Sequence, residues 1–208
     1  MDRVVAIIAD IVGSRELADR DRAQLELERS FARVRELVPL LEGFHPTVGD
    51  EFQAVAGDLA SALTATLAAR LAFPEGVDCR FGLGAGDSRE VTSSRPDDIR
   101  DGSAWWRARE AIETAHRRMD GGRSTVRSWY TADETAGTVN AYLMMRDHVV
   151  SRMKPLDREL TLGQLAGRTQ AELAREHRIT QSAVSQRLER SGGSSLLATV
   201  DLTGGSIR

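Results

Sequence analysis

The apolar residues near the N-terminus form one short, continuous run. Val4 to Ile11 is rich in β-branched residues, and Gly13 closes the run. A half-exposed strand would alternate polar and apolar residues, so this run predicts a strand buried on both faces. Asp10 interrupts it. A carboxylate in such a strand is costly unless it is paired with another charge or holds a cation.

The following pattern alternates between helical and strand-like periods. We expect an amphipathic helix from the charged stretch after residue 15 to about Gly43, a hairpin of 44–48 and 52–56, a helix over 59–71 capped by Asp58, and a strand over 77–86. This order, strand, helix, hairpin, helix, strand, is the βαββαβ arrangement of ferredoxin-like domains. The predicted fold class is therefore α+β.

The pattern continues to a proline that marks a boundary. We expect a polar loop over 88–101, helices over 102–119 and 131–153, and a strand over 126–130. Pro155 ends the last helix. Residues 1–154 are thus interpreted as one α+β domain.

Three short helices are expected after Pro155. They cover 157–167, 170 to about 177, where Thr169 and Glu172 form a capping box, and 181–190, capped by Thr180. Residues 155–193 are interpreted as a small all-α domain, and residues 194–208 as a loosely held tail.

Composition narrows the class of protein. The chain has 208 residues, with 28 basic and 31 acidic side chains and a formal net charge of -3, so any nucleic-acid contact must be local. The single Cys79 excludes an internal disulfide and a cysteine metal cluster. The apolar N-terminal run is too short for a membrane helix and lacks a basic leader. We expect a cytoplasmic protein with no membrane contact.

A second acid, Asp50, follows Gly49 in the predicted hairpin. Two carboxylates at one strand end suit a hard divalent cation, so Asp10 and Asp50 are candidate ligands for Mg²⁺ or Mn²⁺. The alternative is structural, with Asp10 capping the next turn and Asp50 serving the hairpin.

The ordered motifs resemble the catalytic domain of class III nucleotidyl cyclases. They are Ala9-Asp10-Ile11-Val12-Gly13-Ser14, Val48-Gly49-Asp50 and Arg80-Phe81-Gly82-Leu83-Gly84-Ala85-Gly86. Gly49-Asp50-Glu51-Phe52 is also similar to the diguanylate cyclase signature. The resemblance implies metal ligation by Asp10, Asp50 and the carbonyl of Ile11. It implies a candidate nucleotide site of Gly13, Ser14, Gly49, Trp105 and Trp106, although an aromatic pair on a helix is commonly core or dimer contact.

Departures from the cyclase pattern argue against turnover. Pro46 replaces the base-reading lysine, and the helix that should present an Asn and an Arg offers Trp106 and Glu110, or Trp105 and Arg109. Phosphoryl-type transfer needs positive charge at the developing oxyanion, which an acid does not supply.

The C-terminal segment resembles a bacterial helix-turn-helix. Leu173, Ile179, Val184 and Leu188 are expected to point inward, and the outward candidates for DNA contact are Arg168, Gln170, Arg175, Thr180, Gln181, Ser182, Ser185, Gln186, Arg187 and Arg190. Arg178 stands in the turn where glycine is usual. The alternative is a helical dimerisation module, since the segment is only mildly basic.

Together these features resemble the SatD family, cyclase-like domains joined to a helix-turn-helix. We therefore expect a homodimeric transcriptional regulator that binds double-stranded DNA, with a catalytically degenerate cyclase-like sensor or dimerisation domain and a nucleotide as candidate ligand. The rival hypothesis is an active Mg²⁺-dependent nucleotidyl cyclase or related nucleotide enzyme.

Overall fold

The structure is a computed structural model of the chain. It describes residues 3–13, 20–47, 50–91, 99–122, 124–132, 136–205 and 207. No helix within these ranges is long and apolar enough to cross a membrane.

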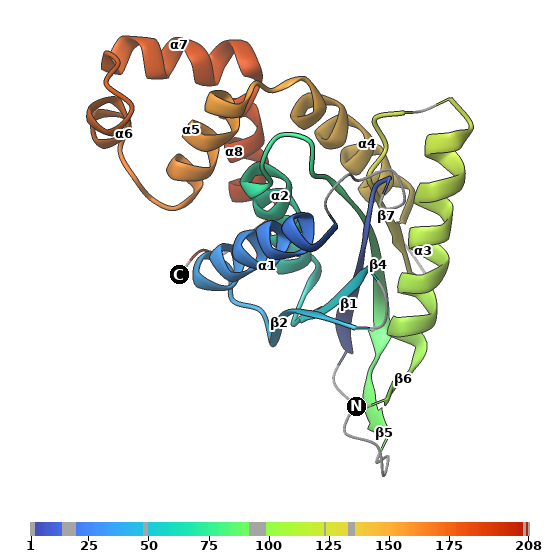
Figure 1. The fold of residues 1–208 in the computed structure, drawn as a ribbon. Coiled ribbons are helices and arrows are strands. Elements are labelled where there is room, and N and C mark those ends of the chain that lie inside the picture. Colours follow the sequence, from blue (N-terminus) through green and yellow to red (C-terminus); the bar gives the residue numbers. More distant parts are fainter. Residues whose placement is uncertain are drawn as a thin grey trace.

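A five-stranded mixed sheet forms the centre of the molecule (Figure 1). Its strands are β1 (Arg3–Ile11), β2 (Glu42–Pro46), β3 (Glu51–Ala56), β4 (Cys79–Asp87) and β7 (Ser128–Thr131), in the order β2-β3-β1-β4-β7. β1 is antiparallel to both β3 and β4, and β7 is parallel to β4. The long central strand is buried on both faces, as its apolar run predicts.

Helices cover both faces of the sheet. α1 (Arg20–Leu37) and α2 (Leu59–Ala72) lie on one face and α3 (Ser103–Asp120) on the other (Figure 1). Alternate residues of β1 divide between them: Val5 and Ile7 enter the large core with α1 and α2, whereas Ala6 and Ile8 pack against α3. The order β1-α1-β2-β3-α2-β4 confirms the predicted βαββαβ arrangement of an α+β fold.

Glycines in β4 let α3 approach the sheet closely. A Cβ on Gly84 would lie 2.2 Å from the carbonyl oxygen of Ala104 and from the amide nitrogen of Ala108. Gly82 and Gly86 face the α3 backbone in the same way. The alternating glycines therefore have a packing role, because any side chain there would push the helix away.

The region after β4 differs from the prediction of a polar loop over 88–101. It contains a two-stranded antiparallel ladder of β5 (Arg89–Val91) and β6 (Ile99–Asp101). α4 (Ala136–Arg152) then leads from β7 to the C-terminal helices.

Four helices complete the chain. They are α5 (Pro155–Leu165), α6 (Gln170–Glu176), α7 (Gln181–Ser191) and α8 (Gly193–Leu202). The prediction of a loosely held tail over 194–208 is wrong, since α8 occupies most of it. Leu196 and Val200 of α8 and Leu162 and Leu165 of α5 belong to the same core as the sheet. Residues on both sides of Pro155 therefore share one hydrophobic core.

Candidate functional site

A cleft of about 530 Å³ opens at the end of β1 that carries Asp10. It lies between the start of β3 and the middle of α3, residues 109–117. Its lining residues are Asp10, Asp50, Glu51, Arg109, Ile112, Glu113, His116 and Arg117. The structure thus brings the two predicted metal-ligand acids, Asp10 and Asp50, to one cleft.

Strand register places a row of three charges at this end of the sheet, beside the cleft. Asp10 lies opposite Glu51 of β3 on one side and opposite Arg80 of β4 on the other. Nη2 of Arg80 donates to Oδ2 of Asp10 over 2.8 Å, and the Arg80 side chain is almost fully buried. Asp10 therefore already has a cationic partner supplied by the neighbouring strand.

His116 of α3 completes a hydrogen-bonded chain from Arg80 to the helix end. Nη1 of Arg80 donates to Nδ1 of His116 over 2.5 Å, and Nε2 of His116 lies 3.1 Å from a carboxylate oxygen of Asp120. Because an arginine only donates, Nδ1 accepts and the network assigns the proton of His116 to Nε2.

Arg109 is the second cation of the cleft. Its Nη1 and Nη2 donate to the two carboxylate oxygens of Glu51 over 2.5 and 2.9 Å. These hydrogen bonds to Glu51 raise the pKa of Arg109 above its ordinary value. This two-point contact holds α3 against β3, and it pairs the guanidinium of Arg109 with an acid of the protein itself.

The carboxyl of Asp10 has a raised pKa. Burial is the largest cause and the charge of Asp50 adds to it, whereas Arg80 acts in the opposite direction. The interaction with Asp50 shows that the two acids lie near enough to influence each other.

A divalent cation fits the described residues poorly. Arg80 already holds Asp10, and Arg109 holds Glu51. In the described part of the chain, no group of three or more His, Cys, Asp or Glu side chains is arranged to hold a metal ion. The buried side chain of Ile11 carries no ligand atom, and the resemblance implies only its backbone carbonyl in the ligand set.

The predicted nucleotide-site residues that the structure describes, Gly13, Trp105 and Trp106, do not line the cleft. Trp105 is buried against the sheet and its Nε1 donates to Oγ of Ser88 over 3.1 Å, while Trp106 is 67% exposed. Gly13 is exposed at the end of β1 and does not line the cleft. Ser14 and Gly49 lie outside the described residues. Trp105 is a core residue because it faces β1 on the sheet side of α3.

A second candidate site is the α6–turn–α7 unit. Leu173 and Ala174 of α6 pack with Val184 and Leu188 of α7 and with Leu160 of α5. Each helix starts at a threonine cap, Thr169 or Thr180, whose hydroxyl accepts from a backbone amide, and the predicted capping box with Glu172 is confirmed. These apolar contacts fix the angle between two short helices joined by residues 177–180.

The predicted DNA-contact residues fall into two groups. The exposed ones are Arg175, Thr180, Gln181, Ser182, Ser185, Gln186 and Arg190. The remaining three, Arg168, Gln170 and Arg187, are half-buried. Arg168 pairs with Glu176, and Arg187 lies 3.3 Å from Asp157 of α5. These two arginines therefore tie the helices together as well as presenting charge.

Arg178 adopts the left-handed conformation expected for the turn. Its φ is 55°, the one positive φ of a non-glycine residue in the described chain. The side chain is exposed, and the turn keeps its ordinary length with the backbone strained at this residue.

Sequence reasoning missed Glu51, Arg109 and His116 as members of the cleft, and Arg80 as the partner of Asp10. The signal for Arg80 is a charge inside the apolar strand that precedes Gly82, but its meaning depends on pairing with Asp10. Arg109 and His116 lie on a helix whose position over the sheet no local pattern specifies.

Comparisons with known proteins bear on the family and on similarity of fold. None of the curated proteins matches this sequence. One similar solved structure is the "crystal structure of the catalytic core of a rhodopsin-guanylyl cyclase with converted specificity in complex with ATPalphaS". Its TM-score is 0.34 at 17% identity, and the match covers 52% of this chain and 70% of that chain.

The SatD family model matches residues 4–200. This stretch contains the cleft at Asp10, the sheet with its covering helices, and the α6–turn–α7 unit. Because the match runs through nearly the whole chain and not one part of it, this protein belongs to the SatD family.

Proposed function

We propose that the chain is a transcriptional regulator that binds double-stranded DNA as a homodimer through the α6–turn–α7 unit. The observation that carries this proposal is the outer face of α7, where Gln181, Ser182, Ser185, Gln186 and Arg190 are all exposed while Val184 and Leu188 are buried. Glutamine and arginine read base edges in the major groove, and serine meets phosphate.

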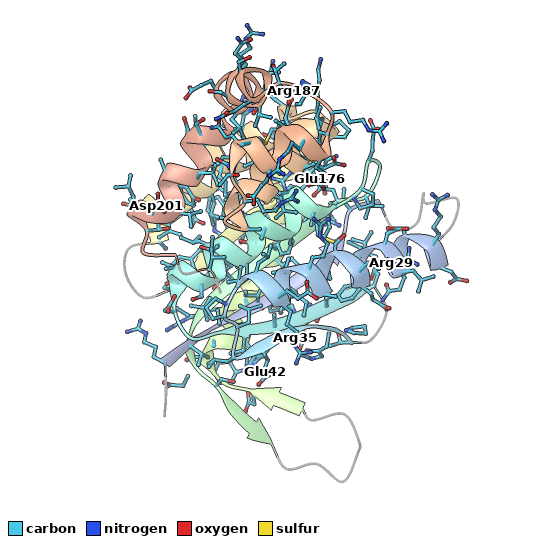
Figure 2. The ribbon with its side chains drawn as sticks, turned by 90° about the vertical axis from the view of Figure 1, so that its left-hand side faces the viewer. Arg29, Arg35, Glu42, Glu176, Arg187 and Asp201 are labelled. Carbon is cyan, nitrogen blue, oxygen red and sulfur yellow. The ribbon has the colours of Figure 1, made fainter. Side chains whose placement is uncertain are left out.

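The position of α7 supports the same function. α7 lies at the outer end of the molecule, away from the β5–β6 ladder, and Arg187 marks it in Figure 2. A helix-turn-helix places the N-terminal residues of its second helix against the bases, which here are Gln181 and Ser182. The α+β domain would then serve sensing or dimerisation.

The charges in the cleft favour this proposal over the rival enzyme. Phosphoryl-type transfer relies on metal ions and on cations directed at the reacting phosphate. In this chain Asp10 is held by Arg80, and Arg109 is held by Glu51. We propose that the cleft retains the cyclase-like arrangement without its chemistry.

The test is DNA binding by the full chain. Genome-wide footprinting identifies the binding sites, which should be inverted repeats with half-sites about 34 Å apart. Fluorescence anisotropy at two salt concentrations then compares wild type with Gln181→Ala, Gln186→Ala and Arg190→Ala. Each glutamine variant should lose about 1 to 3 kcal/mol and relax specificity at one position, since the two residues project from different sides of the helix.

Arg190→Ala should instead weaken binding to all sequences and flatten the salt dependence. The matched control is Arg29→Ala, an exposed arginine of α1 remote from α7 (Figure 2). If wild type binds no site above the non-specific level, or the three α7 variants all bind like Arg29→Ala, the regulator proposal fails. Cyclic product from a nucleoside triphosphate with Mg²⁺, lost in Asp10→Ala, would favour the enzyme.

A further inference from the structure

A second pocket, of about 350 Å³, lies at the junction between the sheet and α5. It shares no lining residue with the cleft at Asp10. Its polar lining comes from several elements: Arg70 of α2, Asp78 just before β4, Arg127 just before β7, Ser151 of α4 and Arg158 of α5. Volumes of this order are typical of sites for small molecules.

Positive charge exceeds negative charge in this pocket. The lining includes three arginines and one acid, Asp78. The carboxylate of Asp78 accepts from Nη2 of Arg70 over 3.3 Å and from Nε of Arg127 over 2.8 Å. Arg70 is also paired with the buried Asp147, at 3.0 Å. Asp78 and Asp147 are thus already paired with Arg70 and Arg127.

Arg158 has no such partner. Across the described residues, its guanidinium makes neither a hydrogen bond nor an ion pair, and its Nε is a buried atom without an acceptor. A buried donor without an acceptor costs free energy. Nε of Arg80 and Nε of Arg118 are also such donors, but Arg80 pairs with Asp10 and Arg118 lies over the ring of Trp129, whereas the guanidinium of Arg158 has no other partner among the described residues. Arg127 uses Nε and Nη1 in hydrogen bonds within the protein.

We propose that this pocket binds a small molecule through an oxyanion group, a phosphate or a carboxylate, held by Arg158 and Arg127. An oxyanion accepts two parallel hydrogen bonds from a guanidinium, and no described residue supplies such an acceptor to Arg158. Val150 and Met153 provide an apolar wall for the rest of the ligand. The ligand would touch both the sheet end and α5, the first of the C-terminal helices.

Isothermal titration calorimetry of the full chain tests the site with inorganic phosphate and, separately, with acetate. The variants are Arg158→Ala and Arg152→Ala. Arg158→Ala should fold normally, because Arg158 has no partner in the protein to lose. Arg152, exposed at the end of α4, does not line the pocket and is the control.

Wild type and Arg152→Ala should bind one of the two oxyanions with the same Kd, and Arg158→Ala should bind it at least tenfold more weakly. The anion that binds more tightly identifies the chemical class. Anions that are excluded from the protein surface stabilise all variants alike. A specific site should therefore give a larger rise in melting temperature in phosphate than in chloride of equal ionic strength, and only in proteins that keep Arg158. Equal binding by Arg158→Ala and wild type, or no binding of either anion at millimolar concentration, overturns the proposal. Neither outcome depends on whether the protein binds DNA.

Discussion

Arg80 places a fixed guanidinium beside Asp10, where a metal ion would otherwise neutralise the acid. The side chain of Arg80 is 7% exposed and that of Asp10 is 30% exposed. Removing one partner of a fully buried pair costs about 3 to 5 kcal/mol, and partial exposure reduces that cost. The charge balance at the cleft therefore rests on a protein side chain.

Arg80→Gln should accordingly lower the free energy of unfolding by about 1 to 3 kcal/mol, because Asp10 is left half-buried without a cation. Millimolar Mg²⁺ should then raise the melting temperature of Arg80→Gln but leave that of wild type unchanged. Arg117→Gln, an exposed arginine of the same cleft, is the control. A Mg²⁺-dependent rise in wild type that disappears in Asp50→Asn would mean instead that the acids bind metal beside Arg80.

Arg178 stores backbone strain in the turn of the helix-turn-helix, with φ at 55°. Arg178→Gly should raise the free energy of unfolding by up to about 1 kcal/mol, because the left-handed conformation is costly for a residue with a Cβ. The greater conformational freedom of glycine in the unfolded chain offsets part of this gain. Arg190→Gly removes the same charge at a helical position and should lose about 1 kcal/mol. Urea unfolding of both variants gives the comparison, and destabilisation by Arg178→Gly would contradict the assignment of strain.

Single residues were only partly predictable from the sequence. Asp10 is conspicuous because a charge in a buried strand needs a partner, and Arg178 because the turn favours glycine. Arg80 and Arg109 are not conspicuous, since their roles depend on strand register and on where α3 crosses the sheet.

At the scale of elements, α3 shows how small residues position a helix. The glycine at 84 in β4 faces the backbone of Ala104 and Ala108. Gly84→Ala should lower the free energy of unfolding by about 1 to 3 kcal/mol or more, because backbone atoms of α3 must move to make room for the methyl group. Gly137→Ala, in α4 with no atom near the added Cβ, should be neutral or slightly stabilising. Thermal unfolding of the two variants tests this contrast, and equal stability would refute the close packing.

The capping box of α6 gives a pH dependence. Hydrogen bonds from the backbone and hydroxyl of Thr169 lower the pKa of Glu172 below its ordinary value of 4.5. Because the folded pKa is depressed, this stabilisation is complete above about 4.5 and is lost as the pH falls through the folded pKa. NMR titration should show that Thr169→Ala raises the pKa of Glu172 towards 4.5. Thr180→Ala, which removes the cap of α7, should leave it unchanged.

Elements with strong periodicity or paired caps were predictable from sequence. The helices α2 and α6 begin where Asp58 and Thr169 predict, since capping is a local interaction. The β5–β6 ladder was missed because short polar strands lack apolar alternation. α8 was missed because its buried apolar residues, Leu196 and Val200, are few. Their burial depends on tertiary packing against the core and not on a local pattern.

At the scale of the whole molecule, the hydrophobic core does not stop at Pro155. Leu162 and Leu165 of α5 and Leu196 and Val200 of α8 lie in the same core as β1 and α2. α5 and α8 also contact α2 directly. A chain cut before Pro155 would expose this surface, so loss of DNA binding on truncation would not isolate the helix-turn-helix. Point substitutions are the sharper test for that reason.

A shared core predicts that the sheet and the C-terminal helices unfold together. Leu196→Ala removes a side chain that is 4% exposed and should cost about 2 to 5 kcal/mol through lost burial and a cavity. Leu202→Ala, in the same helix but 86% exposed, should change stability little. Tryptophan fluorescence follows α3 and β7, which carry Trp105, Trp106 and Trp129. Circular dichroism at 222 nm follows all the helices, including α5 to α8, which contain no tryptophan.

Both signals should fall in a single transition for wild type and move to lower temperature together in Leu196→Ala. The reason is that a cavity beneath α8 weakens packing in the hydrophobic core that α8 shares with the sheet. If part of the helical signal melts early in Leu196→Ala while tryptophan fluorescence keeps the wild-type midpoint, the C-terminal helices are a separate cooperative unit. In that case a ligand at Arg158 would act on the junction between two units, and its binding would shift only the earlier transition.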